Sequence, residues 1–275
     1  MSTDAPLMIA VAPNGARKTK QDHPALPLTP QELADTAASC REAGACMIHL
    51  HVRNKHGEHS LDPDLYLQAI AAVSDSVGEE LIIQITTEAV GIYQPWEQIE
   101  SVRKVRPEAI SLAIRELCPT EQDEPMAAEF FEWLYRERIA PQYILYDLQD
   151  IHRFHELNRR GMIPGDIHTI MLVLGRYTEN QESNPEDLDP LLDAIGSNDI
   201  WWLCAFGKTE SQCMTAAASR GGHCRVGFEN NLHLPDGSLA PNNANLVQVV
   251  QHAAELIGRK PASANQARAL LDSHH

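Results

Sequence analysis

The chain has 275 residues, of which 43% are hydrophobic and 22% are charged. A chain of this length and apolar content can bury roughly three quarters of its unfolded surface, which excludes disorder as its main state. Its 22 lysines and arginines against 38 aspartates and glutamates give a formal net charge of −16. That charge disfavours non-specific binding to nucleic acid or anionic membranes, although a local basic pocket for an anionic ligand is compatible with it.

No segment approaches the apolar length of a membrane-spanning helix, and the first six residues lack the apolar core of a signal peptide. The six cysteines show no Cys-x-x-Cys spacing, and most of them lie in apolar segments. We therefore expect buried, reduced thiols and a cytoplasmic protein. The 13 histidines are many for this length and direct attention to metal binding.

Eight short apolar segments rich in β-branched residues predict strands at 7–12, 46–52, 81–86, 109–114, 142–147, 168–174, 200–205 and 223–228. Amphipathic segments between them predict helices at 30–43, 62–77, 95–105, 121–139, 150–160, 188–196, 208–220 and 242–257, with a further helix near 262–271. Thr29, Pro30 and Glu32 carry the signature of a capping box at the start of the first helix.

Eight alternations of strand and helix within about 250 residues are typical of a (β/α)8 TIM barrel. The alternative is a doubly wound open sheet, but residues 13–15 after the first strand form a Pro-Asn-Gly turn and not a glycine-rich phosphate loop. We predict one barrel domain over residues 1–275, with an extra C-terminal helix. The polar segment 175–187 then becomes a long loop on the active-site face.

His49 and His51 lie two residues apart at the end of the second predicted strand. A strand directs residues at this spacing to the same side, so both imidazoles can reach one ion. The alternative is that the His-x-His spacing occurs by chance. His56 and His59 in the following loop are not included among the ligands, because a flexible loop positions them poorly.

A third ligand has to come from another strand end. Arg225, Gly227 and Glu229 share one face of the last predicted strand, so a cation and a carboxylate project together. Zinc accepts two histidines and a carboxylate and keeps a position open for a ligand oxygen. A strand-end salt bridge between Arg225 and Glu229 is the alternative.

Five segments occur in order along nearly the whole chain: 12–16 (APNGA), 49–53 (HLHVR), 84–87 (QITT), 221–231 (GGHCRVGFENN) and the end from Asn245 to Arg268. Together they resemble the β-keto acid cleavage enzymes, whose founding activity is the cleavage of 3-keto-5-aminohexanoate. The resemblance implies a (β/α)8 barrel, in agreement with the count of strands and helices. It also implies zinc bound by His49, His51 and Glu229.

The resemblance further implies a Claisen-type exchange in which a β-keto acid and acetyl-CoA give acetoacetate and a new acyl-CoA. Zinc would polarise the keto oxygen and stabilise a developing enolate or alkoxide, and the hydroxyl of Thr86 would hold an oxyanion. The partners are then a small β-keto acid and an acyl-CoA, with no nucleic acid and no membrane.

The chain departs from the family pattern beside its arginine on the eighth strand, which is Arg225. An aspartate usually follows the glutamate and pairs with that arginine, whereas this chain has Asn230, which can orient a guanidinium but adds no charge. We expect the catalytic residues to be Arg225, Asn230 and Thr86. Either another carboxylate, such as Glu88 or Glu116, replaces the missing one, or the chemistry has changed.

A second departure concerns the substrate, because Arg17 stands where the aminohexanoate enzyme uses a glutamate to bind an ammonium group. A guanidinium inverts this charge preference and favours a β-keto acid with a neutral polar or anionic tail. The alternative is a solvent-exposed arginine in the basic run 17–20.

The remaining binding residues follow from their places at strand ends. We expect the substrate to contact Asn14, Arg17, Thr86, Thr87, Ser111 and Glu116. Arg115 either lines the same pocket or pairs with Glu116. Lys208, in the seventh loop, is expected to bind CoA phosphates, since the last loops of such barrels often bind phosphate.

Two alternative functions are also compatible with the sequence. One is a zinc-dependent barrel lyase or hydrolase that does not use CoA, and the other is a non-catalytic ligand-binding relative. The resemblance also implies a homotetramer, for which Trp201, Trp202 and the C-terminal helix offer either an interface or core.

Overall fold

A computed structural model describes residues 5–272. Eight parallel strands close into a barrel in the order β1-β10-β9-β8-β7-β6-β5-β2, and β2 pairs back onto β1. They are β1 (Ile9–Val11), β2 (Met47–Leu50), β5 (Ile82–Thr86), β6 (Ala109–Ala113), β7 (Ala140–Leu145), β8 (Thr169–Leu174), β9 (Ile200–Ala205) and β10 (His223–Val226). All eight predicted strands are confirmed, and so is the (β/α)8 barrel.

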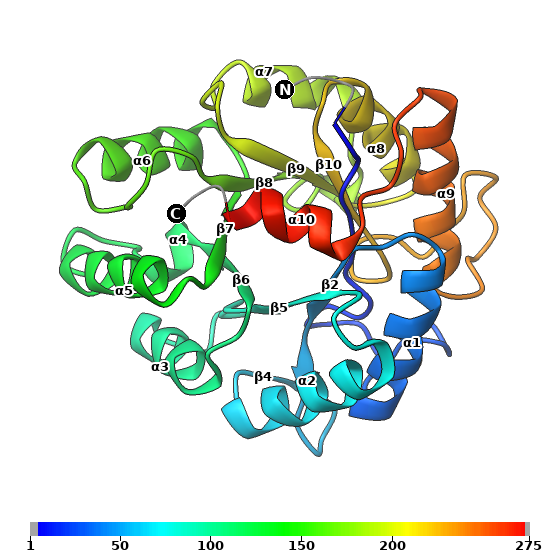
Figure 1. Ribbon diagram of the computed structural model, residues 1–275, viewed down its shortest axis with the longest axis horizontal. Helices are drawn as coiled ribbons and strands as arrows, with labels where there is room; N and C mark the ends of the chain where they lie inside the picture. Colours follow the sequence, from blue (N-terminus) through cyan, green and yellow to red (C-terminus); the bar gives the residue numbers. More distant parts are fainter. Residues whose placement is uncertain (1–4, 273–275) are drawn as a thin grey trace.

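Helices surround the barrel (Figure 1). They are α1 (Pro30–Glu42), α2 (Pro63–Val77), α3 (Pro95–Val105), α5 (Glu124–Glu137), α6 (Leu148–Arg159), α7 (Leu188–Leu192), α8 (Glu210–Ser219) and α9 (Asn243–Leu256). The predicted capping box exists: the side chain of Thr29 accepts from the amide of Glu32, and the Glu32 carboxylate accepts from the amide of Thr29. Each helix places an apolar face on the sheet, as a barrel requires.

The structure adds elements that are too short for a periodic signal. β3 (Val52–Arg53) and β4 (His59–Ser60) form a small antiparallel hairpin after β2, α4 (Ile114–Leu117) follows β6, and the 3-10 turns η1 (Glu179–Gln181) and η2 (Pro185–Asp187) lie in the loop after β8. The helix expected at 188–196 ends at Leu192, because its buried apolar residues are confined to Leu188 and Leu191.

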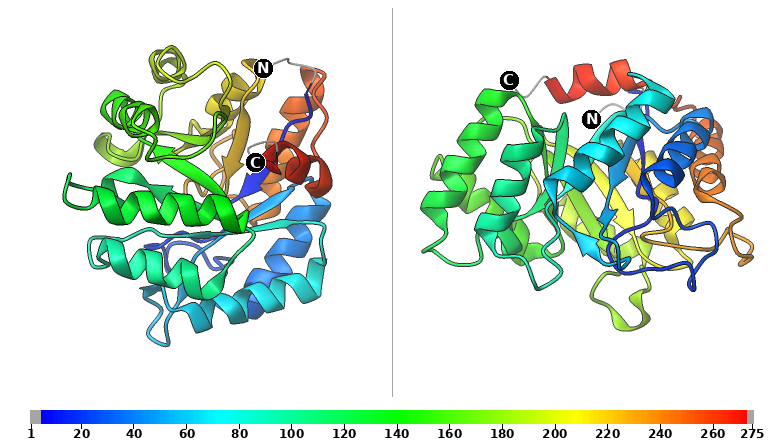
Figure 2. Two further views of the ribbon diagram at one scale, coloured as in Figure 1. Left: turned by 60° about the vertical axis from the view of Figure 1, so that its left-hand side comes forward. Right: turned by 90° about the horizontal axis from the view of Figure 1, so that it is seen from below.

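The extra C-terminal helix, α10 (Ala264–Leu271), lies across one end of the barrel (Figures 1 and 2). Ala267 and Leu271 belong to an apolar cluster with residues of the barrel interior such as Met8, Met47 and Trp202. Met8 directly precedes β1, Met47 begins β2, and Trp202 lies in the first half of β9. The helix therefore closes the N-terminal end of the barrel and leaves the C-terminal end for a ligand.

Two other expectations concern the core. Trp201 and Trp202 are 5% and 0% exposed, so these side chains belong to the core of the chain and do not form an interface. All six cysteines are buried and free, as expected. Among residues 5–272, no helix combines the length and the apolar character needed to cross a bilayer.

Candidate metal centre and active site

A cavity of about 310 Å³ opens at the C-terminal end of the barrel, opposite α10. Its walls come from the carboxyl ends of the strands and the loops that follow them, where barrel enzymes carry their active sites. The lining residues include the candidates Asn14, Arg17, His49, His51, Thr86, Glu88, Arg225 and Glu229. Residues predicted from four different segments of the sequence therefore surround one cavity.

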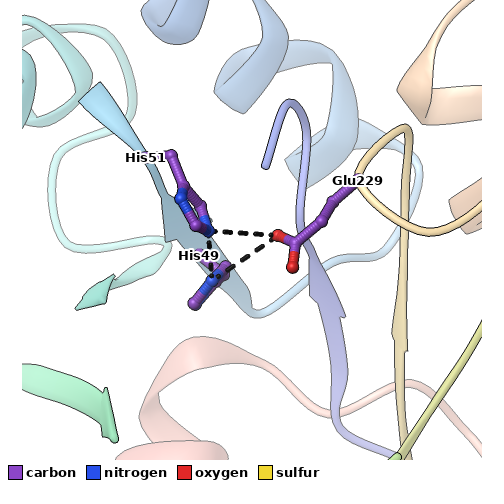
Figure 3. A group of neighbouring side chains, drawn as sticks. All are labelled: His49, His51 and Glu229. Carbon is purple, nitrogen blue, oxygen red and sulfur yellow. Dashed lines mark hydrogen bonds and ion pairs between the residues drawn. The ribbon is translucent and has the colours of Figure 1, made fainter. Parts of the chain in front are cut away.

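His49, His51 and Glu229 converge at this cavity (Figure 3). The Nε2 atoms of the two rings are 3.1 Å apart, and Oε2 of Glu229 lies 3.6 Å from Nε2 of His49 and 3.3 Å from Nε2 of His51. Both histidines are 1% exposed. The strand period thus directs both imidazoles to one side, as the spacing predicts.

The donor set fits a divalent metal ion. Within the described part of the chain, Oε2 of Glu229 is buried and receives no hydrogen bond of regular geometry. A buried carboxylate oxygen without a donor is costly unless a cation satisfies it. Two imidazoles and one carboxylate match zinc, which would keep an open coordination position for a ligand.

The protonation states suit the same role. Oε1 of Gln84 accepts a hydrogen bond from Nδ1 of His49 at 2.8 Å, and Nε2 of Gln84 donates to Gln142 at 3.3 Å, which fixes the orientation of the amide. The lone pair of His49 therefore lies on Nε2, toward the cavity. Burial and the charge of Arg225 lower the pKa of His49 to about 3, so the ring is neutral at physiological pH.

Arg225 lies beside the candidate ligands and is 4% exposed. Its Nη2 donates to Oε1 of Glu229 at 3.2 Å and to Sγ of Cys204 at 3.1 Å. Burial by itself would raise the pKa of the Glu229 carboxyl, but the charge of Arg225 and the neighbouring His51 hold it well below its usual value. Glu229 is therefore ionised, and it is the carboxylate partner of Arg225.

Asn230 is buried nearby, but its side-chain atoms make no hydrogen bond within residues 5–272, and none joins it to Arg225. Of the two carboxylates considered as replacements for the family's aspartate, Glu88 lines the cavity and Glu116 does not. Neither forms an ion pair with Arg225; Glu229 occupies that position instead.

Two glycines allow the loops to meet at Glu229. Gly15 has φ +60°, and a Cβ there would lie 2.6 Å from Cγ of Glu229. Gly227 has φ +137°, and a Cβ there would lie 2.3 Å from the main-chain oxygen of Ala12. Larger residues would separate the loop after β1 from the loop after β10, and this would move Glu229 away from the histidines.

Thr86 ends β5 and lines the cavity. Its Oγ1 accepts hydrogen bonds from the amide of Glu88 at 3.1 Å and from Oγ of Ser111 at 3.3 Å. Both acceptor positions of the hydroxyl are therefore occupied, and its proton can be donated to a ligand. Ser111 and Thr87 are buried behind it and do not line the cavity, so they support Thr86.

Asn14 contacts the main chain of His51. Its Nδ2 donates to the main-chain oxygens of His51 and Pro27 at 2.9 and 3.0 Å, while its Oδ1 is buried without a partner among the described residues. Asn14 thus ties the loop after β1 to the segment that carries both histidines.

The mouth of the cavity carries a cluster of charges. Nη1 of Arg17 donates to Oε1 of Glu88 at 2.6 Å, and Nη2 of Arg176 lies 3.6 Å from the same oxygen. Arg17 is 53% exposed, so the structure places it at the cavity edge, with a carboxylate partner. Glu116 accepts from the amide of Ala89 and supports the Glu88 segment from behind.

Other expected residues lie outside the cavity. Arg115 forms ion pairs with Asp147 and Asp150 and not with Glu116. Lys208 is exposed in the loop between β9 and α8, at the same end of the barrel, and does not line the cavity.

Several lining residues were not expected from the sequence, among them Lys18, Tyr146, Arg176 and Phe206. A signal was available for three of them, because Tyr146, Arg176 and Phe206 follow the carboxyl ends of β7, β8 and β9 directly or within two residues. Lys18 has no such signal, since it lies well beyond β1; its Nζ donates to the main-chain oxygen of Glu229 at 2.6 Å.

Glu210 supports the loop that carries Glu229. It begins α8, is 2% exposed, and accepts a hydrogen bond from Nδ2 of Asn231 at 3.1 Å, while its Oε1 has no partner among the described residues. Burial raises the pKa of Glu210 to about 8, even though the Asn231 hydrogen bond opposes the shift. The side chain is therefore largely protonated at neutral pH in the folded protein.

This shift predicts a pH effect on stability. A carboxyl whose pKa is higher in the folded state contributes stability that is complete below about pH 4.5 and is lost as the pH rises toward 8. Glu210→Gln, which is neutral at every pH, should therefore gain stability relative to the natural protein between pH 5 and 8, by roughly 2–4 kcal/mol. Urea unfolding at several pH values, in the presence of a chelator, measures this. Exposed Glu255→Gln is the control, and parallel pH profiles for Glu210→Gln and the natural protein would contradict the prediction.

A (β/α)8 barrel with two histidines and a glutamate converging at the C-terminal end, next to a buried arginine, defines a class of barrel proteins with a candidate metal centre. Within that class, residues 6–272 match the family described as beta-keto acid cleavage enzyme. The chain belongs to this family. The resemblance found in the sequence is therefore confirmed, as is the prediction that the chain is an enzyme.

Two relatives and one solved structure illustrate the similarity. The chain is 31% identical to a 3-oxoadipate:acetyl-CoA acetyltransferase of Cupriavidus necator, over 97% of this chain and 94% of the relative. It is 30% identical to a 3-keto-5-aminohexanoate cleavage enzyme of Fusobacterium nucleatum, over 96% and 97%. The solved ternary complex of ObcA with a C4-CoA adduct and oxalate shares the fold, with a TM-score of 0.75, 16% identity, and coverage of 90% of this chain and 68% of that one.

Proposed function

We propose that this protein is a zinc-dependent acyltransferase that condenses a β-keto acid with acetyl-CoA to give acetoacetate and a new acyl-CoA. The observation that carries the proposal is the group formed by His49, His51 and Glu229, whose ligand atoms lie within 4.8 Å of one another in a cavity that Arg225 also lines. The relatives named as acetyl-CoA acetyltransferase and as β-keto acid cleavage enzyme support the reaction class.

A divalent ion bound by these three residues would polarise the keto oxygen and the carboxylate of the substrate. Side chains of the protein provide further electrostatic stabilisation of the substrate. Arg225 stays charged in its buried position next to Glu229 and stabilises negative charge that develops on the substrate. Thr86 donates its hydroxyl proton toward an oxyanion, because Glu88 and Ser111 occupy its acceptor positions.

Other residues have supporting roles in this proposal. Asn14 holds the loop after β1 against His51, and Thr87 and Ser111 hold Thr86 from behind. Asn230 is buried in the loop after β10, with a side-chain amide that makes no hydrogen bond among residues 5–272, and Lys208 meets the CoA phosphates outside the cavity at the same end of the barrel. The natural acid carries a neutral polar or anionic tail.

The reaction is tested by incubating purified protein with a panel of β-keto acids and acetyl-CoA, with mass-spectrometric detection of acetoacetate and the new acyl-CoA. We expect both products in equal amounts and about one zinc ion per chain in the same preparation. Cleavage of a β-keto acid in the absence of any CoA would indicate a lyase or hydrolase instead. Bound zinc without turnover of any acid would indicate a non-catalytic relative.

A substitution of Arg17 tests which charge the protein prefers on the tail of the β-keto acid. Arg17→Glu should raise the KM for dicarboxylic β-keto acids and lower it for amino-bearing ones, because the substitution places a second carboxylate next to Glu88. The ratio of the two kcat/KM values is expected to change on the order of tenfold or more. Lys20→Glu is the matched control: Lys20 is on the same loop and pairs with Glu32, outside the cavity. An unchanged ratio in Arg17→Glu would show that Arg17 does not select the charge of the substrate tail.

We further propose a homotetramer in the cytoplasm, with the chain as one domain. The exposed Leu256 and Ile257 at the end of α9, 76% and 40% accessible, support association between copies. Size-exclusion chromatography with light scattering measures the number of subunits.

A further inference from the structure

The charged side chains that line the cavity comprise four cations and three carboxylates: Arg17, Lys18, Arg176, Arg225, Asp22, Glu88 and Glu229. Three of these cations donate hydrogen bonds within the chain. Lys18 and Arg225 donate to Glu229, and Arg17 donates to Glu88. The guanidinium of Arg176 makes no hydrogen bond within residues 5–272, and its ion pair with Glu88 is long, at 3.6 Å. Arg176 therefore has its donors available for a ligand.

Arg176 is held in place even without such a ligand. Its guanidinium lies 5.2 Å from the centre of the Phe206 ring and 6.0 Å from that of Tyr177, and its side chain is 16% exposed. The loop that carries it projects from the barrel at the end away from α10 (Figure 2). The Oγ of Ser183, in the same loop, lies 3.0 and 2.7 Å from the main-chain oxygens of Leu174 and Phe206 and shares its single proton between them, which fixes the loop to β8 and β9.

Glu88 lies between Arg176 and the candidate metal ligands. One oxygen of this carboxylate lies 3.8 Å from Nδ1 of His51, and the other lies between Arg17 and Arg176. A single carboxylate therefore separates the candidate metal ligands from two guanidiniums. Arg17 donates a hydrogen bond to Glu88, whereas Arg176 keeps its hydrogen-bond donors available, so this end of the cavity is suited to one anionic group of a ligand.

We propose that Arg176, in addition to Arg17, determines specificity, and that its guanidinium binds the distal carboxylate of a short dicarboxylic β-keto acid. This inference rests on the proposed function and deepens it, since it names the substrate class. The keto-acid end of the substrate lies at His49, His51 and Glu229, and the far carboxylate lies against Arg176. Ile144 and Val173 line the same cavity and contact the carbon chain between the two ends.

The phosphates of CoA are another anionic ligand for a cation at this end of the barrel. The burial of Arg176 favours the acid, because a largely buried guanidinium one carboxylate away from His51 is placed for the substrate tail and not for an extended cofactor at the surface. The two sources are separated by measuring the KM of acetyl-CoA and the KM of the acid in the same variants.

The experiment compares Arg176→Gln, Arg176→Lys and the natural protein on two acids of equal length, 3-oxoadipate and 3-oxohexanoate, with saturating acetyl-CoA. We expect Arg176→Gln to lower kcat/KM for 3-oxoadipate on the order of 30-fold and that for 3-oxohexanoate by less than about threefold. Arg176→Lys should recover part of the loss. Arg115→Gln removes a cation from the same end of the barrel, outside the cavity, and should change neither value.

Equal losses on both acids would make Arg176 a purely structural residue, and no loss on either would remove its role. A rise in the KM of acetyl-CoA alone would assign Arg176 to the CoA phosphates. Calorimetric binding of 3-oxoadipate to the zinc-loaded protein gives a readout without turnover, and the affinity should fall in Arg176→Gln by the same factor. If no β-keto acid reacts but this binding difference is found, the proposed function fails while the carboxylate site stands.

Discussion

We expect His51→Ala to abolish stoichiometric zinc binding and to lower the turnover of the β-keto acid on the order of 1,000-fold or more. The physical reason is that the variant loses one of the three candidate ligands. Only Nε2 of His49 and the buried Oε2 of Glu229 then remain to bind the ion. Glu229→Gln should have the same effect, because an amide oxygen is a weaker ligand and removes the negative charge.

Metal content by mass spectrometry after chelation and reloading measures this prediction without reference to activity. Zinc at about 100 times its dissociation constant should stabilise the natural protein by about 2.7 kcal/mol and leave both variants unchanged. His59→Gln is the matched control, since His59 is another buried histidine, its ring centre is 5.2 Å from that of His51, and it lies outside the converging group. Full zinc occupancy in His51→Ala would overturn the proposed metal centre.

Arg225→Gln is expected to lower kcat by about 100- to 1,000-fold with little change in zinc content. Arg225 is a buried cation with a hydrogen bond to Oε1 of Glu229, while the converging oxygen of that carboxylate is Oε2. Removing the guanidinium therefore removes electrostatic stabilisation next to the substrate and leaves the three candidate ligands present.

Arg225→Lys keeps the charge without the planar geometry and should retain more activity than the glutamine variant. Steady-state kinetics together with zinc analysis separates the two roles, with Arg115→Gln as the control for loss of an arginine at this end of the barrel. A proportional loss of zinc and activity in Arg225→Gln would show that the arginine only holds Glu229 in place.

These predictions share a structural basis. The cavity combines candidate ligands from the end of β2 and the loop after β10 with an arginine from β10 and a hydroxyl from the end of β5. These groups come from three separate segments of the chain, and the closure of the sheet brings them together. This is why the strand ends of a barrel accept changes in loop residues, such as Arg17 and Arg176, without a change in the central chemistry.

The eight strands could be predicted from the sequence, because each is a short apolar segment between two predicted helices, and a regular alternation of strands and helices is compatible with few folds. The sequence also predicted that His49 and His51 share a side, since the strand period is a local property of the backbone. The family motifs then pointed to Glu229 and Arg225 as their partners.

The pairing of the remaining charged side chains could not be predicted from the sequence and became visible in the folded chain. Arg225 pairs with Glu229 and not with Asn230, and Arg17 and Arg176, about 160 residues apart in the chain, meet at Glu88. Such pairings depend on loop conformations and on which strand ends face each other across the barrel. Periodicity in the sequence describes one element at a time and carries no information about those distances.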